Sequence, residues 1–353
     1  MNKKLRVGIL GATGTVGQRF IQLLEHHPQF EVTALAASDR SRGKQYADAC
    51  SWRLGGTLPQ SVGKLVVQAP EPPLDCEVVF SSLPGDIARA TEGSFAAAGF
   101  PVISNSSAYR MDANVPLLIP EVNHEHLSLL EAQRKQFASG GFIVTNPNCS
   151  TIMLALALAP LHAKFAVKSV VVTTMQALSG AGYPGVASLD ILDNVLPFIA
   201  GEEEKIEQET LKILGTGNGN QIEHATMAVS AQCNRVNVAD GHFASVRVKL
   251  GRPAGLEEIK DAFVSFSSLP QQLGLHSAPA QPILVLEEPD RPQPKLDRDA
   301  GDGMSITIGR LQADTVLDYR FVVLSHNTIR GAAGAAVLNA EMLIAKGLLT
   351  IPG

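Results

Sequence analysis

The sequence predicts an α/β fold in two parts, the first built on a parallel sheet and the second on a mixed or antiparallel sheet. In the first 148 residues, short apolar runs alternate with amphipathic ones, which is typical of right-handed βαβ units. After Cys149, apolar and polar residues alternate along β-branched runs, as they do in strands with one buried face. A length of 353 residues also suits two domains, each with a core of its own.

Short runs rich in valine and isoleucine predict the strands of the first part. They are Arg6–Leu10, Val32–Ala36, Leu65–Val67, Val78–Ser82, Val102–Ser104 and Ile143–Thr145. Amphipathic stretches between these runs predict three helices. They are Thr15–His27, Ile87–Ala98 and His124–Phe137.

The second part is expected to begin with the helix Thr151–Ala163. Its expected strands are Val167–Thr174, Phe243–Leu250, Ser305–Ile308 and Tyr319–Leu324, and a charged helix runs from Gly201 to Gly215. The last helix, Ile329–Ala345, opens with small residues that allow close backbone approach, and we assign it to the first part. The predicted domains are therefore residues 1–148 with 327–353, and residues 149–326.

The composition excludes several classes of protein. There are 29 basic and 34 acidic side chains, a formal net charge of −5, and no basic run suggests a nucleic-acid partner. Apolar residues make up 45% and charged residues 18% of the chain, which is globular composition. The start of the chain is too short for a signal peptide, and the longest apolar run, Ile152 to Leu161, is interrupted by Pro160. We therefore expect a cytoplasmic enzyme with no membrane partner.

The four cysteines, at positions 50, 76, 149 and 233, show no CxxC spacing. Neither a metal site nor a disulfide scaffold is therefore expected.

A glycine-rich loop, GATGTVG at positions 11–17, lies between the first strand and the first helix. Gly11 allows a tight turn, Gly14 lets backbone approach a pyrophosphate, and Gly17 lets helix and strand pack closely. The phosphates would lie on free amides at the helix N-terminus. The alternative is a glycine-rich turn without a ligand, but the order of strand, loop and helix favours a Rossmann-type dinucleotide-binding domain.

The end of the second strand bears on the choice of cofactor. An acidic residue there, such as Asp39, would hold the ribose 2′-hydroxyl of NAD, whereas Ser38 and Arg40 would hold the 2′-phosphate of NADP. Because a guanidinium suits a phosphate and these two residues share one side of an extended chain, we favour NADP. A solvated Arg40 is the alternative.

Cys149 stands at the start of an apolar helix, between the polar residues Asn148 and Ser150. Unpaired helix amides and the helix dipole are expected to lower the pKa of its thiol and make it nucleophilic. The alternative, a small buried cysteine, is accepted for Cys50, Cys76 and Cys233. A thiolate beside a nicotinamide cofactor indicates aldehyde–acyl chemistry through a thioester.

Such chemistry needs a proton carrier and an anion-binding group. His242 can carry a proton near neutral pH, and Arg235 offers a planar fork for a substrate carboxylate. A turn at Asp240-Gly241 leaves their relative orientation undetermined. Glu202 and Lys205 share one helix face, where a solvated ion pair is the ordinary interpretation.

Taken together, these segments resemble the aspartate-semialdehyde dehydrogenase family, in particular its archaeal and fungal branch. The resemblance spans nearly the whole chain and rests on GATGTVG, ASDRSRGK, NSSAYRMD, NPNCSTI, QALSGAGYPGV, GEEEKIEQET, QCNRVNVADGH and HNTIRGAAGAA, in that order. It implies a Rossmann domain joined to a glyceraldehyde-3-phosphate-dehydrogenase-like α+β domain for catalysis and dimerisation. It also implies NADPH-dependent reduction of L-aspartyl 4-phosphate, on the route to lysine, methionine and threonine, by a homodimer or homotetramer.

The resemblance implies roles for individual residues. Cys149 would be the acyl-thioester nucleophile, His242 the acid/base, Gln176 a group that orients the substrate, and Arg235 the ligand of its α-carboxylate. Glu202 would contact the α-amino group, and Lys205 and Arg110 the phosphate. The cofactor site would be lined by Gly11, Thr13, Gly14, Thr15, Val16, Ser38, Arg40, Ser179, Gly180 and Asn327.

Other functions remain open at this point. N-acetyl-γ-glutamyl-phosphate reductase resembles this fold but differs in the segment around its nucleophile, whereas malonyl-CoA reductase is similar to the same branch. Glu202 favours an aspartyl substrate, since only such a substrate has an amino group to meet it. A non-catalytic NADP-binding sensor is the alternative from another class, and the joint presence of Cys149, Arg235 and His242 argues against it.

Overall fold

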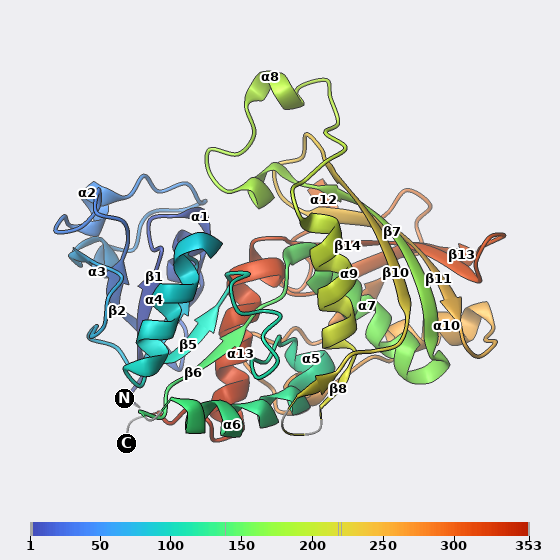
Figure 1. Cartoon of the computed structure of the whole chain (residues 1–353). Helices are drawn as coiled ribbons and strands as arrows, with labels where there is room; N and C mark the ends of the chain where they lie inside the picture. Colours follow the sequence, from blue (N-terminus) through green and yellow to red (C-terminus); the bar gives the residue numbers. More distant parts are fainter. Residues whose placement is uncertain (1–2, 138, 218, 220, 352–353) are drawn as a thin grey trace.

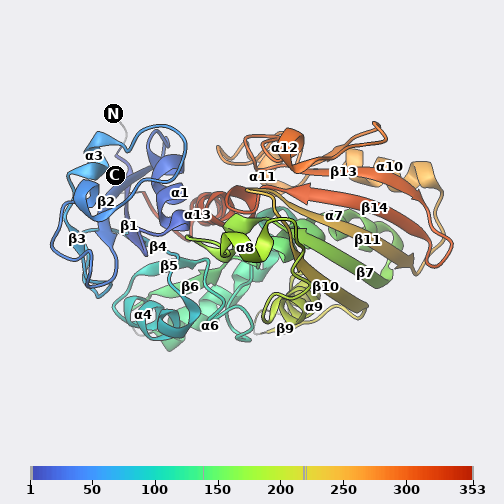
Figure 2. The same ribbon diagram turned by 90° about the horizontal axis from the view of Figure 1, so that it is seen from above.

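Two six-stranded sheets organise the protein, whose computed structural model describes residues 3–137, 139–217, 219 and 221–351. The sheets lie side by side, with α13 (Gly334–Ala345) between them (Figure 1). Both chain ends lie beside the first sheet (Figures 1 and 2).

The first sheet is parallel throughout, in the order β3-β2-β1-β4-β5-β6. Its strands are β1 (Leu5–Leu10), β2 (Phe30–Ala36), β3 (Val67–Gln68), β4 (Val78–Ser81), β5 (Pro101–Ser104) and β6 (Phe142–Thr145). The strand order reverses between β1 and β4, which is the point where ligands bind in open α/β sheets. The glycine-rich loop follows β1 at this point.

The helices of this half are α1 (Thr15–Leu24), α2 (Tyr46–Ala49), α3 (Gln60–Gly63), α4 (Gly85–Ala97), α5 (Pro120–Asn123), η1 (His124–Ser128) and α6 (Leu129–Gln136). Two expectations need correction. The stretch expected as one helix from His124 is a 3₁₀ turn followed by α6. The third strand begins later than expected, because the Leu65 carbonyl accepts a hydrogen bond from the backbone of Tyr46 and lies outside the ladder.

The second sheet is mixed, as predicted, in the order β10-β7-β11-β14-β13-β12. Its strands are β7 (Val167–Gln176), β10 (Ala228–Arg235), β11 (His242–Leu250), β12 (Ile283–Val285), β13 (Ile306–Ala313) and β14 (Tyr319–Ser325). The pairs β10–β7 and β12–β13 are parallel and the others antiparallel. The sequence did not predict β10 or β12. Both are edge strands: in β10 exposed polar residues weaken the apolar pattern, and β12 is only three residues long.

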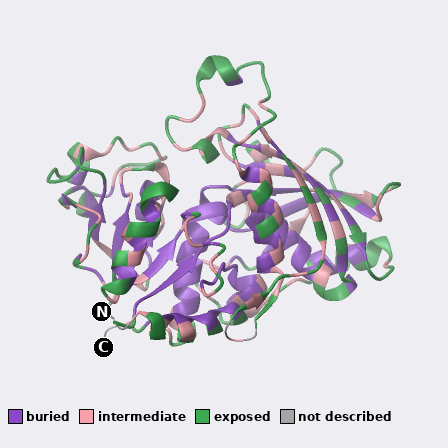
Figure 3. Cartoon of the chain, viewed as in Figure 1, coloured by how far each residue is buried: buried purple, intermediate pink, exposed green. Residues whose placement is uncertain are grey.

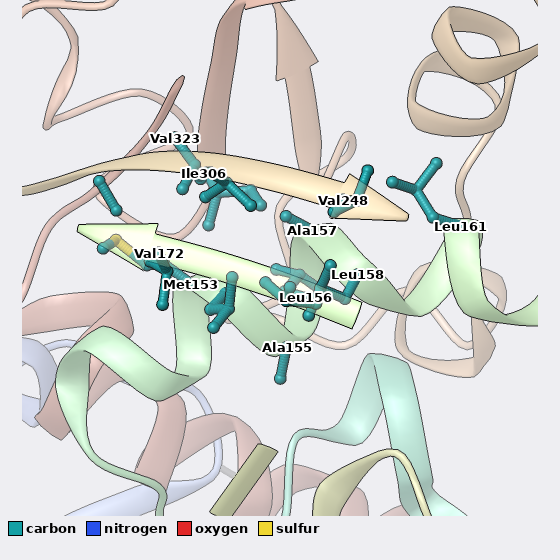
Figure 4. Packing of buried hydrophobic residues seen from close by; sticks show 14 of the residues in the cluster. Met153, Ala155, Leu156, Ala157, Leu158, Leu161, Val172, Val248, Ile306 and Val323 are labelled. Atoms are coloured by element: carbon teal, nitrogen blue, oxygen red, sulfur yellow. The ribbon is translucent and has the colours of Figure 1, made fainter. Parts of the chain in front are cut away.

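The core of the second half lies between this sheet and α7 (Cys149–Phe165). Figure 4 shows Met153 and Leu156 of α7 packed against Val172, Val248 and Val323 of the sheet. The helices α9 (Glu202–Ile213) and α10 (Leu256–Val264) extend this layer. Because α7 is apolar on every side, it can only be a buried helix (Figure 3).

The last helix, α13 (Gly334–Ala345), follows a π-helical turn, η3 (Ile329–Ala333). Its residues Ala336, Val337 and Leu343 belong to the same apolar cluster as Val7 and Phe20 of the first half. The exact domain boundaries, residues 1–148 with 327–353 and residues 149–326, stay a prediction.

One excursion of the chain protrudes from the second half, between η2 (Leu178–Ala181) and α9, and carries α8 (Ser188–Ile191) (Figure 1). The remaining short elements are β8 (Thr216–Gly217), β9 (Ile222–Glu223), α11 (Leu269–Gln272) and α12 (Pro294–Asp297). Within the described part of the chain, no helix is long and apolar enough to cross a membrane.

Candidate active site

The ends of three neighbouring strands bring predicted site residues together. Gln176 ends β7, Arg235 ends β10, and His242 begins β11. Since β7 lies between the other two strands and pairs Gln176 with Arg235, the three side chains meet at one edge of the sheet. The relative orientation of Arg235 and His242, which the sequence left open, is set by this strand order.

The backbone of Ala177 binds the side chains of both His242 and Arg235. Its N–H donates to Nδ1 of His242 at 3.0 Å, and its carbonyl accepts from Nη1 of Arg235 at 2.8 Å. Gly180 packs directly on the pair: a Cβ there would lie 2.8 Å from Nη1 of Arg235 and 2.9 Å from Nε2 of His242. Only glycine therefore fits at position 180.

His242 is fully buried, and burial first and the charge of Arg235 second lower its pKa to about 3. The ring is therefore neutral at physiological pH. Because Nδ1 accepts the hydrogen bond from Ala177, the ring proton sits on Nε2, which has no partner among the described residues. In this state His242 can donate one hydrogen bond to an oxygen of a ligand.

Cys149 is the first residue of α7 and is half-buried. The expectation that helix amides lower its thiol pKa is wrong for the unliganded protein. The side chain of Asn148 caps the helix and accepts hydrogen bonds from the amides of Ser150 (2.9 Å) and Thr151 (3.3 Å), so these donors are taken. Burial first, and then the charge of Glu202, raise the pKa of Cys149 to about 12, against the opposing charges of Arg110 and Arg235.

The carboxylate of Glu202, close to Cys149, accepts hydrogen bonds from three side chains. It accepts from Nδ2 of Asn148 at 2.9 and 3.0 Å, from Nε2 of Gln176 at 3.2 Å and from Nζ of Lys205 at 3.0 Å. Glu202 is 7% exposed. The interpretation of Glu202 and Lys205 as a solvated pair is therefore wrong, because the carboxylate faces the site and not the solvent.

A second carboxylate, Glu209, supports the site from about two turns further along α9. Its Oε1 accepts from Nη1 of Arg110 at 3.0 Å, and its Oε2 from the backbone N–H of Asn148 at 2.6 Å. Arg110 also donates through Nη2 to the Asn105 carbonyl at 2.7 Å, while its buried Nε has no partner in the described part of the chain. Arg110 can thus bind an anion through Nε.

Lys212, on the same face of α9, binds three backbone carbonyls that follow Arg110 in the chain. Its buried Nζ donates to the carbonyls of Arg110 (2.6 Å), Asp112 (2.8 Å) and Val115 (2.8 Å). The sequence analysis missed Glu209 and Lys212. Their positions in the helix could have indicated them. Both follow Glu202 at helical spacing, on the face of α9 that also carries buried apolar residues.

The glycine-rich loop has the conformation that its sequence predicts. Gly11 has φ +77°, and a Cβ there would lie 2.9 Å from the Ser82 carbonyl oxygen. A Cβ at Gly17 would lie 2.7 Å from Cα of Ala12, so helix and loop can pack only through glycine. Gly14 is the N-cap of α1 without a capping side chain, which leaves amides at this helix end available to a phosphate.

A cavity of about 640 Å³ opens at this loop, which is room for part of a dinucleotide. It is lined by Thr13, Gly14, Thr15, Val16, Gln18, Ser38, Arg40, Ser41, Ala49, Ser51, Arg53, Ser82, Gly182 and Tyr183. Most of the predicted cofactor residues therefore share one cavity. Asp39 does not line it, which removes the nearest carboxylate from the place where a 2′-phosphate would bind.

A second cavity, of about 290 Å³, continues toward the catalytic residues and includes Ser179. The Asn327 side chain donates to Oγ of Ser179 at 2.8 Å and accepts from the backbone of Gly241 at 2.9 Å. From the following turn, Gly331 packs on the nucleophile, since a Cβ there would lie 2.7 Å from Cβ of Cys149. The predicted cofactor residues thus lie next to the predicted catalytic ones, through the contacts of Gly180 with Arg235 and His242.

Of the other cysteines, Cys50 and Cys76 lie outside this site, whereas the buried Cys233 contacts Gln176 at its edge. Burial raises the pKa of Cys76 to about 12 and that of Cys233 to about 11, and it also raises that of Cys50. The residues that the structure describes contain no cluster of His, Cys, Asp and Glu that could hold a metal ion.

Comparison with known proteins agrees with this arrangement. A family model described as semialdehyde dehydrogenase, NAD binding domain, matches residues 6–130, and one described as semialdehyde dehydrogenase, dimerisation domain, matches residues 158–330. Aspartate-semialdehyde dehydrogenase of Archaeoglobus fulgidus is 54% identical over 345 residues, covering 97% of this chain and 99% of the relative. The crystal structure of the Candida albicans aspartate-semialdehyde dehydrogenase with NADP superposes with a TM-score of 0.90 at 48% identity, covering 98% of this chain and 99% of the other. The Vibrio cholerae enzyme complexed with ASA is more distant, with a TM-score of 0.76 and 27% identity over 97% of this chain and 99% of the other. This chain belongs to the aspartate-semialdehyde dehydrogenase family.

Proposed function

We propose that this chain reduces L-aspartyl 4-phosphate to L-aspartate 4-semialdehyde with NADPH, releasing phosphate, in the biosynthesis of lysine, methionine and threonine. One observation carries the proposal: the half-buried Cys149 is surrounded by two guanidinium groups and one carboxylate, Arg110, Arg235 and Glu202. A substrate with an anion at each end and an ammonium group between them matches this charge pattern.

The substrate is bound by its charges. Arg235 receives the α-carboxylate, and Glu202 receives the α-amino group in the place where it now binds Lys205. Lys205, released from Glu202, joins Nε of Arg110 in binding the phosphate. Gln176 keeps Glu202 oriented through its 3.2 Å hydrogen bond.

Substrate binding activates the nucleophile. The negative charge of Glu202 is one of the causes that keep Cys149 protonated, and a substrate ammonium group neutralises that charge. The sulfur of Cys149 then attacks the acyl carbon, the acyl C–O bond to phosphate breaks, the S–H proton passes to the departing phosphate, and a thioester forms on Cys149. The Nε2–H of His242 donates to the substrate carbonyl oxygen as negative charge develops on it.

The cofactor fits the glycine-rich cavity. Ser38 and Arg40 would hold the 2′-phosphate of NADP, the loop from Thr13 to Val16 the diphosphate, and Ser179 with Asn327 the nicotinamide end. Bound NADPH supplies the hydride that reduces the acyl group. Because Gly180 and Gly331 have no side chains, they leave room for the nicotinamide to approach the acyl group on Cys149 closely.

A homodimer is proposed for the assembly, with a homotetramer as the alternative. The face of the second sheet opposite α7 carries exposed apolar residues such as Val171, and the excursion beside it exposes Leu189 and Phe198, at 89% and 70%. Large exposed apolar side chains are typical of a protein–protein interface. A cytoplasmic location stays a prediction from the sequence.

The test is a spectrophotometric assay of NADP reduction by aspartate semialdehyde, with and without phosphate. We expect turnover that depends on both phosphate and the semialdehyde and that disappears in Cys149→Ser. Binding of NADP without any turnover would favour the sensor, and turnover with malonyl-CoA but not with aspartyl phosphate would favour malonyl-CoA reductase.

A further inference from the structure

Arg53 and Tyr183 meet across the mouth of the cofactor cleft. Arg53 belongs to the first half, between α2 and α3, and Tyr183 belongs to the excursion that follows β7. The guanidinium carbon of Arg53 lies 4.3 Å from the centroid of the Tyr183 ring, which is a cation–π contact. This contact links the two halves of the protein.

The backbone of Arg53 is fixed to the glycine-rich loop. The side chain of Gln18, which is 2% exposed, accepts from the N–H of Arg53 at 2.7 Å. The same side chain donates to the carbonyls of Thr13 (3.1 Å) and Ser51 (3.2 Å). The position of Arg53 relative to the phosphate-binding loop is therefore set by a buried amide and not by a mobile surface turn.

The hydrogen-bond donors of the Arg53 side chain are available. Throughout the described part of the chain, no carboxylate lies within ion-pair distance of this guanidinium and no hydrogen bond from it is formed. The ring of Tyr183 contacts the face of the guanidinium, whereas its N–H donors lie in the plane. An anion can thus bind at the edge of the group while the cation–π contact is kept.

The location of Arg53 in the cleft indicates which part of a bound dinucleotide it would contact. Arg53 and Tyr183 line both the 640 Å³ cavity and the 290 Å³ cavity, and they share this position with Thr15, the first residue of α1. Arg40, in contrast, lines only the first cavity, together with Ser38. The diphosphate of a dinucleotide lies between its two nucleoside ends, and so does Arg53.

We propose that Arg53 binds the diphosphate of the dinucleotide cofactor and that Tyr183, stacked on its guanidinium, positions it for this contact. The inference rests on the proposed function, since it takes the cleft to be the cofactor site. It assigns the two arginines of the cleft different tasks: Arg53 contributes equally to NADPH and NADH, and Arg40 distinguishes between them. Cofactor binding is thereby coupled to the excursion that carries Tyr183.

The experiment measures dissociation constants of NADPH and NADH by fluorescence titration, without substrate. Arg53→Ala is expected to weaken both cofactors by about ten- to a hundredfold, because one charge-assisted hydrogen-bonding group is lost from a part that both share. Arg40→Ala is expected to weaken NADPH alone. Arg42→Ala is the matched control: Arg42 is exposed on the same half but lines neither cavity, and its removal is expected to change neither constant.

A second set of variants tests whether the contribution of Tyr183 to cofactor affinity requires Arg53. Tyr183→Leu is expected to weaken both cofactors, and Tyr183→Phe, which keeps the ring, to weaken them less. The double variant Arg53→Ala/Tyr183→Leu is expected to lose no more affinity than Arg53→Ala alone, because Tyr183 acts through the arginine.

Two results would overturn the inference: unchanged affinities in Arg53→Ala, or a loss confined to NADPH, which would move Arg53 to the 2′-phosphate. Fully additive losses in the double variant would reject the role of Tyr183. Each of these requires that the wild-type protein binds NADPH. A wild-type protein that binds neither cofactor would instead reject the proposed function.

Discussion

Glu209 Oε2 accepts a 2.6 Å hydrogen bond from the backbone N–H of Asn148, a residue 61 positions earlier in the chain. Asn148 directly precedes the predicted nucleophile, so α9, which packs on both α7 and β10, fixes the start of α7. Because the other oxygen of Glu209 pairs with Arg110, one buried carboxylate positions both the nucleophile and a predicted phosphate ligand.

Glu209→Gln tests this support. The substituted amide has one acceptor oxygen for two donors, so either Arg110 or the backbone of Asn148 loses its partner. We expect the free energy of unfolding to fall by about 1–3 kcal/mol, measured in urea, and kcat to fall as well. Glu204→Gln removes an exposed carboxylate from the same helix and serves as the control. Equal behaviour of the two variants would mean that Glu209 does not support the site.

Glu202→Gln tests the origin of the raised thiol pKa. Without substrate, the rate of iodoacetamide labelling of Cys149 should increase with pH well above neutrality, since the thiol pKa is about 12. Removing the charge of Glu202 should increase the labelling rate at pH 8, although it weakens substrate binding. Peptide mapping identifies the labelled cysteine. A wild-type rate that levels off near pH 7 would contradict this assignment.

Arg235→Lys tests whether the planar guanidinium geometry of Arg235 is needed to bind the substrate carboxylate. Arg235 donates one hydrogen bond to the Ala177 carbonyl, and its other N–H groups can bind a carboxylate. The ammonium group of lysine cannot reproduce this geometry. We expect KM for aspartate semialdehyde to rise by about tenfold or more. Arg320→Lys, on an exposed strand position, is the control. Normal KM and kcat in the Arg235 variant would show that charge alone suffices.

His242→Asn tests the pH dependence of stability. The pKa of His242 is lowered from 6.5 to about 3 on folding, so the unfolded chain binds more protons between these values. The folded state therefore loses stability as pH falls through this window, and the full contribution of the neutral ring is present above pH 6.5. Urea unfolding at pH 4.5 and 7.5 should show a smaller difference for the variant than for the wild type. Some difference will persist, because burial also lowers the pKa of His326.

The sequence predicted the first half well because its signals are local. The glycine-rich loop requires backbone conformations that only glycine adopts at Gly11, and each buried parallel strand is a short apolar run. The edge strand β10 was not predicted, since alternate residues of its first five are exposed and two of these, Ser230 and Gln232, are polar.

The site was predicted as a set of residues and not as a geometry. Residue types identified Cys149, Arg235 and His242, but the tautomer of His242 follows from the backbone of Ala177, which directly follows β7, the strand between those of Arg235 and His242. The thiol pKa was predicted in the wrong direction, because it is raised first by burial and then by Glu202, whose place beside Asn148 depends on a contact across 54 positions. Long-range contacts of this kind leave no periodic trace in the sequence.

The position of α13 in the core of the first sheet has a consequence for folding during translation. Residues of this helix, which ends at Ala345, complete the apolar cluster begun by β1 and α1. The ribosome therefore releases the second half of the chain before the last helix that the first sheet needs. Until then the first sheet keeps an exposed apolar surface, so the nascent chain depends on protection from aggregation until synthesis is nearly finished.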